Sequence, residues 1–286
     1  MSVLSRERPS APAPAGNLAT GLLKLIALLF MFIDHTGKVL FNNAADMRLL
    51  GRIAFPIYAW CIVVGFHYTR SVPRYLGRLL LTGLVSQPFY VLALDYEGHV
   101  GALISRVLSP LAEGFSFAGL GKVLDTVFLA KPNIFLTLFL GLAALWGIRE
   151  KKYLSHLWGP AAAIILATVL GADYGWKGVL LFILLYACRE RSSAIAAVMV
   201  AFFLFWGASY NVTTNLFGIP LSLGSLPDWI GLPLRAFMRL ETYALLSLPF
   251  ILLPFSRDVR LPKWLAYGLY PAHLILIILL KLMVFG

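Results

Sequence analysis

Nine long apolar runs, separated by polar connections, constrain the fold of this chain more than any other feature. They lie at about residues 19–41, 53–69, 75–94, 133–148, 157–171, 176–188, 194–210, 241–255 and 264–285. Several approach the ~20 residues that a helix needs to cross the hydrocarbon core of a bilayer. Only 13% of the residues are charged, against about 25% in a soluble domain. We therefore predict an all-α, polytopic helical membrane protein with about nine transmembrane helices.

The positive charge of the chain lies mainly in the connections between these runs. The formal net charge is +11, and basic residues mark every second connection. These residues are Arg70, Arg74 and Arg78, then Arg149, Lys151 and Lys152, then Arg189 and Arg191, and finally Arg257, Arg260 and Lys263. This alternation is the positive-inside pattern, and it predicts a cytoplasmic N-terminus. It also favours contact with membrane lipids over a nucleic-acid partner.

The domain organisation follows from the same pattern. Residues 1–18 are polar and proline-rich, which predicts a disordered cytoplasmic tail. Residues 19–286 form one predicted transmembrane domain, because no other segment has the composition of a soluble domain. The two long connections, 95–132 and 211–240, face outward on this topology and are predicted to be interfacial or re-entrant segments.

Ionisable residues interrupt the first run. Asp34, His35 and Lys38 follow a stretch that is apolar except for Lys24. A charged side chain at this depth costs at least ~3 kcal/mol on insertion scales, so it needs a partner or a function. Adjacent helical residues point about 100° apart, so Asp34 and His35 should face different neighbours. Arg52 begins the second run at the same depth, which predicts an ion pair with Asp34.

Polar side chains from other runs are expected at this same outer depth. They are Gln87, Asn133, Asp173, Tyr174, Glu241, Tyr270 and His273. Prolines within the second, third and ninth runs can unwind a helix locally, which membranes tolerate where the freed backbone lines a cavity. We therefore predict that one polar site gathers residues from most of the runs.

The residue chemistry leaves three hypotheses open. A histidine with an ordinary pKa near 6.5 suits general-base or nucleophilic catalysis. The same Asp34 and His35 could instead relay protons in a proton-coupled transporter or permease. A third possibility is a non-catalytic assembly factor for a pilus or surface polymer. The sequence has no serine-elbow motif, no P-loop and no cluster with metal-ligand spacing, so no metal site is predicted.

Short motifs around these residues follow one another in a particular order. They are Leu23-Lys24-Leu25-Ile26-Ala27, Asp34-His35-Thr36-Gly37, Gly51-Arg52-Ile53-Ala54-Phe55-Pro56, Ser86-Gln87-Pro88-Phe89, Asn133-Ile134-Phe135-Leu136-Thr137-Leu138, Asp173-Tyr174-Gly175, Ala244-Leu245-Leu246-Ser247-Leu248-Pro249 and Tyr270-Pro271-Ala272-His273-Leu274. In this order the motifs resemble the TraX family of integral membrane proteins, over about residues 20–285.

The resemblance implies an acetyltransferase. The named member of that family acetylates the N-terminal amine of the conjugative pilin subunit in the bacterial inner membrane, with acetyl-CoA as donor. By this likeness we expect a transmembrane acyltransferase-type domain that uses acetyl-CoA. The expected acceptor is a pilin amine or a glycan or lipid hydroxyl at the cell surface.

The resemblance and the predicted topology together give each candidate residue an expected role. His35 is the expected catalytic base or nucleophile, with Asp34 and Arg52 holding the local geometry. The cationic residues expected to bind the acetyl-CoA phosphates from the inner side are Arg70, Arg74, Arg78 and Lys24. The acceptor pocket is expected to contain Gln87, Asn133, Asp173, Tyr174, Glu241, Tyr270 and His273.

Overall fold

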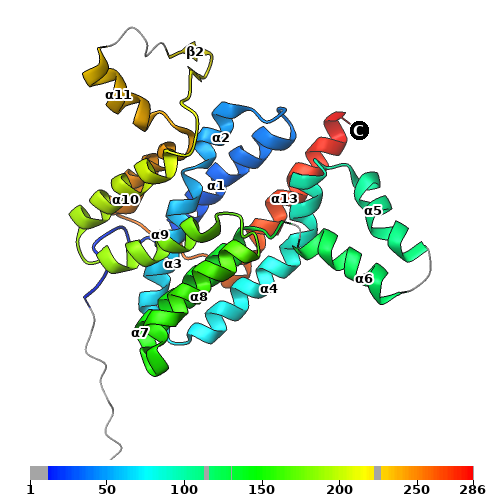
Figure 1. Ribbon diagram of the computed structural model, residues 1–286, viewed down its shortest axis with the longest axis horizontal. Coiled ribbons are helices and arrows are strands. Elements are labelled where there is room, and N and C mark those ends of the chain that lie inside the picture. The colour runs from blue at the N-terminus through cyan, green and yellow to red at the C-terminus, as the bar shows by residue number, and fades with distance from the viewer. Residues whose placement is uncertain (1–11, 113–115, 130, 222–226, 286) are drawn as a thin grey trace, which may run out of the picture.

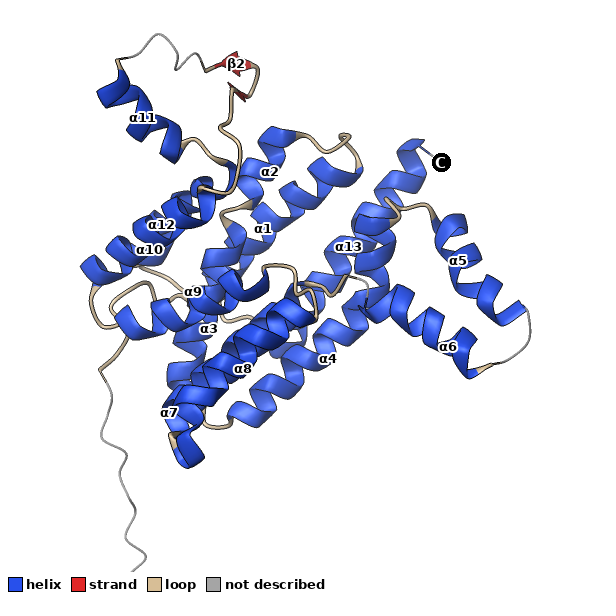
Figure 2. Cartoon of the chain, in the orientation of Figure 1, coloured by secondary structure: helices blue, strands red, loops and turns tan. Residues whose placement is uncertain are grey.

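The computed structural model describes residues 12–112, 116–129, 131–221 and 227–285, and most of them are helical (Figure 2). The longer helices are α1 (Thr20–Val39), α3 (Ala54–Tyr68), α4 (Val72–Tyr90), α7 (Ile134–Glu150), α8 (Ser155–Val169), α9 (Gly175–Cys188), α10 (Ser192–Gly207) and α13 (Lys263–Phe285). The shorter α-helices are α2 (Ala45–Gly51), α5 (Val100–Ala112), α6 (Phe117–Leu124), α11 (Asp228–Phe237) and α12 (Leu248–Leu252). Helical turns of other types are η1 (Val91–Asp95), η2 (Asp125–Leu129), η3 (Lys152–Leu154) and η5 (Leu240–Ser247).

A two-stranded hairpin is the one sheet in the described part of the chain. Strands β1 (Asn215–Leu216) and β2 (Ile219–Pro220) pair antiparallel. Phe217 and Gly218 form the turn with positive φ angles of 51° and 82°. Two successive residues with positive φ are typical of the type I′ turn that closes tight hairpins. The predicted all-α class is otherwise confirmed.

Each of the nine predicted runs contains helix in the structure. Eight correspond to the longer helices, and the run at 241–255 corresponds to η5 with α12. Three helical segments of the described chain are both long and apolar enough to cross a membrane: Ala45–Tyr68, Val72–Asp95 and Lys263–Val284. A helical membrane protein fits these segments, and the number of nine transmembrane helices stays a prediction.

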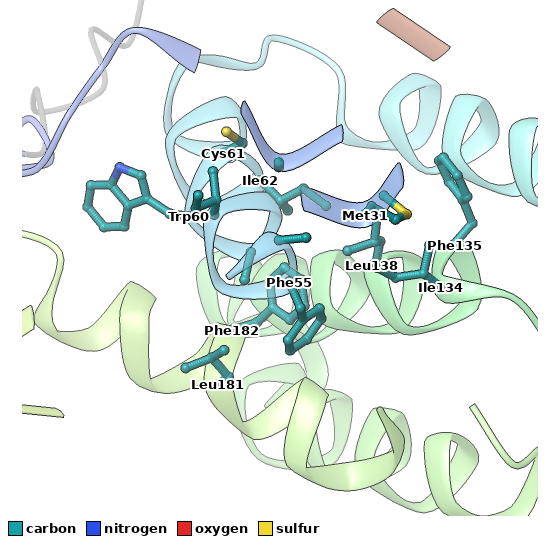
Figure 3. Close-up of a cluster of buried hydrophobic side chains, with 14 of the residues drawn as sticks. Met31, Phe55, Trp60, Cys61, Ile62, Ile134, Phe135, Leu138, Leu181 and Phe182 are labelled. Carbon is teal, nitrogen blue, oxygen red and sulfur yellow. The ribbon is translucent and has the colours of Figure 1, made fainter. Parts of the chain in front are cut away.

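Helix α3 lies at the centre of the helical body. Its side chains are buried almost all the way round, as expected for a helix without a polar face. Figure 3 shows Phe55 of α3 beside Phe182 of α9, where the two rings meet edge to face at 6.1 Å. Helix α7 closes this core from the side, and Gly141 allows its backbone to approach the Phe182 ring. The core therefore fixes α1, α7 and α9 around α3.

The basic connections meet at one end of the body, which we call the basic end. Arg149, after α7, donates to the carbonyl oxygen of Phe66 near the end of α3 at 3.3 Å. The carboxylate of Asp258 accepts hydrogen bonds from the first backbone N–H groups of α1. These contacts bring together connections that are distant in sequence. The opposite end carries α2 (Figure 1), together with the α8–α9 connection and η5, and we call it the polar end.

The chain just before α1 is ordered, which differs from the predicted disordered tail over residues 1–18. Asn17 is 1% exposed, and its side chain donates to the carbonyl oxygen of Phe250 at 3.0 Å. The indole N–H of Trp60 donates to the Asn17 carbonyl at 2.8 Å. This segment is held because it satisfies the polar atom of a fully buried tryptophan. Residues 1–11 of the predicted tail lie outside the described residues.

The two long connections contain short helices. Helices α5 and α6 form a pair that extends away from the body, and α11 extends from the polar end on the other side (Figure 1). Helix α11 exposes large apolar side chains, among them Trp229 and Leu232. Exposed apolar residues on short helices fit the predicted interfacial segments. Their placement in a membrane interface stays a prediction.

Candidate functional site

Two buried histidines meet where the first and last long helices pack together. His35 Nδ1 of α1 and His273 Nε2 of α13 are 3.0 Å apart, and their rings stack with centroids 5.2 Å apart. The two residues are only 8% and 6% exposed. One nitrogen of this contact must carry the proton and the other must accept it. The contact engages Nδ1 of His35, so Nε2 is the ring nitrogen through which His35 can act on a substrate.

Asp34 points in a different direction from His35, as the helical geometry predicts. In place of the predicted pair with Arg52, Asp34 pairs with Arg48, with Oδ1 3.6 Å from Nε. The α-carbon of Gly51 packs directly against the Asp34 side chain, and a Cβ at this position would overlap it. The α1–α2 turn therefore sets the partner of Asp34, because it brings Arg48 within reach.

Arg52 has a partner that the sequence analysis did not assign to it. Its guanidinium nitrogen lies 3.3 Å from the carboxylate of Glu241 in η5, and the two side chains are 13% and 5% exposed. This ion pair connects the short link between α2 and α3 with a segment 189 positions later in the chain. Burying two charges is tolerable only when they compensate each other. The pair therefore fixes η5 against the α2–α3 junction.

These groups line one cavity at the polar end, which we call the polar cavity. Its volume is about 350 Å³. The predicted site residues in its lining are Asp34, His35, Arg52, Asp173, Tyr174, Glu241 and Tyr270. The lining also includes the cationic residues Lys38, Arg48 and Lys177 and the aromatic residues Tyr90, Trp176, Trp206 and Tyr210. Ionised groups of both signs beside aromatic rings suit a polar acceptor molecule.

Asp173 lies on the connection between α8 and α9, outside the long helices. Asp173 is exposed to solvent at the cavity. Arg52 and Asp34 are close enough for their charges to act on its carboxyl group in opposite directions.

Gln87 and Asn133 do not line the polar cavity. The Gln87 side chain accepts from the Asn133 backbone N–H at 2.9 Å and donates to the Lys131 carbonyl at 2.8 Å. Asn133 caps the start of α7 by accepting from the Phe135 N–H, and it also donates to the Gly83 carbonyl. These hydrogen bonds join α4 to the start of α7 and cap that helix. The predicted acceptor-site role of Gln87 and Asn133 stays a prediction.

A second cavity, at the basic end, brings together most of the predicted phosphate-binding residues. Its volume is about 450 Å³, and we call it the basic cavity. Lys24, Arg70 and Arg78 line it, together with Lys263, which the sequence analysis assigned only to topology. Arg78 lies over the rings of Tyr75 and Tyr267 at 5.4 and 5.9 Å. Arg74 is not in this lining and is exposed.

A narrow space of about 30 Å³, which we call the neck, lies between the two cavities. Met31, Ile134 and Tyr270 line both the neck and the polar cavity. Lys24, Tyr58, Phe135, Leu138, Leu261 and Ala266 line both the neck and the basic cavity. Figure 3 shows Met31 close to Ile134, Phe135 and Leu138. The three spaces therefore form one series along the inner face of α1.

Arg48 and Lys38 line the polar cavity and were not predicted as site residues. Arg48 stands near Asp46 in a connection of mixed charge, and nothing in that pattern marks it as a partner of Asp34. Lys38 follows His35 by three residues, which on a helix places both on neighbouring faces. That spacing was the available signal for Lys38.

With this geometry established, comparison with known protein families gives a clear result. A model of the family described as "TraX protein" matches residues 19–281, nearly the whole chain. The chain belongs to the TraX family.

The curated relatives match over shorter stretches. The probable fimbrial assembly protein FimC, serogroup H1, of Dichelobacter nodosus is 36% identical over 72 residues, which cover 24% of this chain and 30% of that protein. The uncharacterized protein RP591 of Rickettsia prowazekii (strain Madrid E) is 31% identical over 87 residues, or 30% of this chain and 33% of that protein. The chain thus spans about a third of the length of these relatives. No solved structure matches it.

The Arg52–Glu241 pair predicts a large effect on stability. The substitution Glu241→Gln keeps the side-chain shape but removes the carboxylate that forms the ion pair with the Arg52 guanidinium. We expect a loss of about 3–5 kcal/mol in the free energy of unfolding, as for other broken buried pairs. Chemical unfolding of the purified protein in detergent measures this loss.

The matched control is Glu190→Gln. Glu190 forms an ion pair with Arg189 at 2.8 Å, but its side chain is 42% exposed. Its loss should cost below about 1 kcal/mol. Equal effects of the two substitutions would contradict the assigned role of the Arg52–Glu241 pair.

Proposed function

We propose that this protein is an inner-membrane acetyltransferase. In this proposal acetyl-CoA enters the basic cavity from the cytosol, and the acceptor enters the polar cavity from the outer side of the membrane. The observation that carries the proposal is the series of three spaces, which leads from a basic entrance to His35. Membership in the TraX family supports this reaction class.

The basic cavity fits the phosphate-bearing end of acetyl-CoA. Lys24, Arg78 and Lys263 supply cationic donors around one space, and arginine in particular binds phosphate through two hydrogen bonds. Lys24 and His35 lie on the same helix, eleven residues apart, or about 16 Å along its axis. An extended pantetheine arm can cover such a separation. The neck would then hold the arm, and the acetyl group would reach the polar cavity.

The histidine pair is suited to remove a proton from the acceptor. When His35 Nδ1 donates to His273 Nε2, the lone pair of His35 Nε2 is free to act as a general base. His273 would hold the ring and its tautomer, as the orienting group of a catalytic triad does. Its burial keeps bulk water away from the pair and strengthens the contact.

The proposal includes an orientation and a class of acceptor. The basic end would face the cytoplasm, in agreement with the positive-inside pattern, and the nine apolar helical segments would span the membrane. A relative named as a probable fimbrial assembly protein favours a role in pilin modification or conjugation. The acceptor would be the N-terminal amine of a pilin or the hydroxyl of a surface glycan or lipid.

Replacing His35 tests the proposed reaction. The purified protein is mixed with radiolabelled acetyl-CoA and one acceptor at a time. One acceptor is a peptide with a free N-terminal amine, and the other is a monosaccharide. We expect the wild-type protein to release CoA and label one acceptor, and His35→Ala to lose at least about 10²-fold in rate, since a general base contributes this much or more. His99→Ala is the matched control, because His99 is exposed.

Unchanged transfer by His35→Ala would overturn the catalytic role of His35. No CoA release by the wild-type protein, together with flux driven by a pH gradient in liposomes, would instead establish the transporter alternative.

The basic cavity gives a second prediction. Arg78→Ala should raise the KM for acetyl-CoA about 10-fold, because one charge-assisted contact to a phosphate contributes about 1.4 kcal/mol or more. Arg74→Ala removes the same charge from an exposed position outside the cavity lining and should leave KM nearly unchanged. Steady-state kinetics of the two variants make the comparison. An equal rise in both would show that only general positive charge matters at this end.

A further inference from the structure

The hydroxyl group of Tyr270 is buried and has no hydrogen-bond partner among the described residues. The residue is 4% exposed. An unpaired buried hydroxyl costs about 1–3 kcal/mol, so native proteins keep few of them, and each one calls for an explanation. Tyr270 lines the polar cavity, so a ligand held there is a candidate partner for this hydroxyl.

Tyr270 lies where the neck meets the polar cavity. It lines both the neck and the polar cavity, together with Met31 and Ile134. Met31 and Ile134 are apolar, so Tyr270 has the one side-chain hydrogen-bond donor shared by the two linings within the described chain. A carbonyl group that passes from the neck toward His35 therefore passes Tyr270, the residue that carries this donor.

Neighbouring rings hold Tyr270 in this position. Its ring meets Phe135 edge to face at 4.8 Å and His273 at 5.0 Å. His273 follows three residues later on α13, so one helical turn carries both the orienting histidine and this hydroxyl. A donor fixed before the substrate arrives needs no reorganisation during the reaction, which is the requirement for electrostatic stabilisation of a developing charge.

We infer that the Tyr270 hydroxyl is a catalytic donor that binds the carbonyl oxygen of the acetyl thioester. This inference rests on the proposed function and adds a residue to it. The acceptor nitrogen or oxygen attacks the carbonyl carbon, the carbonyl π electrons move to the oxygen, and His35 Nε2 takes the proton of the acceptor. Tyr270 donates its hydrogen bond to the resulting oxyanion. The oxyanion then re-forms the carbonyl as the C–S bond breaks, and the proton from His35 passes to the CoA thiolate.

The substitution Tyr270→Phe separates this role from a structural one. It removes one oxygen atom and keeps the ring against Phe135 and His273. We expect kcat for acetyl transfer to fall about 10²-fold, the usual effect of losing one oxyanion donor, with little change in the KM for acetyl-CoA. The melting temperature, measured in detergent without acetyl-CoA, should stay equal or rise, because the lost hydroxyl has no partner to stabilise.

A matched control is Tyr243→Phe, at a partly buried tyrosine that is not among the residues lining these cavities. It should leave both measurements unchanged. A lower melting temperature of Tyr270→Phe with unchanged kcat would overturn the inference and assign the hydroxyl a structural role. If the wild-type protein transfers acetyl groups and Tyr270→Phe has the same kcat, the inference about Tyr270 is overturned and the proposed function stands. Absence of transfer by the wild-type protein would overturn the proposed function itself.

Discussion

The contact between His35 and His273 joins the first and last long helices in the interior of a largely apolar body, and the arrangement of the site depends on it. Two imidazole rings hydrogen-bonded to each other satisfy one polar atom on each side without introducing a charge. Each ring would be costly to bury alone. The contact also leaves Nε2 of His35 outside this hydrogen bond. In this way one buried hydrogen bond joins the two helices and, in the proposed reaction, leaves Nε2 to act as the base.

The charged residues around this contact are arranged in separate pairs. Asp34 lies against Arg48, and Arg52 lies against Glu241, so the acids near His35 already have cationic partners. The histidine pair is therefore not drawn into an ion pair with either acid. The basic cavity lies toward the other end of α1, where cations would hold the phosphate groups of the proposed donor while its arm enters the neck. Separating phosphate recognition from proton transfer fits a protein whose two substrates arrive from opposite sides.

The sequence predicted the helices and the centre of the site, because both follow from the cost of placing polar groups in an apolar environment. The runs are apolar enough to identify as helices one by one, and Asp34 and His35 stand out within the first of them. Their adjacent positions on a helix also predicted that they would face different partners. Of the four cationic residues expected to bind acetyl-CoA, the structure gathers Lys24, Arg70 and Arg78 around one cavity and leaves Arg74 outside it, and the binding role stays a prediction.

The pairings could not be predicted, because they depend on how distant segments pack. Arg52 and Asp34 lie at similar depth, yet the α1–α2 turn brings Arg48 to Asp34, and η5 brings Glu241 to Arg52. Gln87 and Asn133 resemble site residues in sequence, but they serve the α4–α7 contact by completing backbone hydrogen bonds. The unpaired Tyr270 hydroxyl is visible only when all its neighbours are placed.

The central claim is that donor and acceptor reach His35 from opposite ends, and sided delivery of acetyl-CoA tests it most directly. The protein, with an epitope tag at its N-terminus, is reconstituted into liposomes, and protease access to the tag gives the orientation. Acetyl-CoA is then supplied on one side only, and release of CoA thiol is measured in the presence of the acceptor. The account predicts release when acetyl-CoA is on the side of the N-terminus and the basic cavity, and little release from the other side. Equal release from both sides, or release only from the polar end, would contradict it.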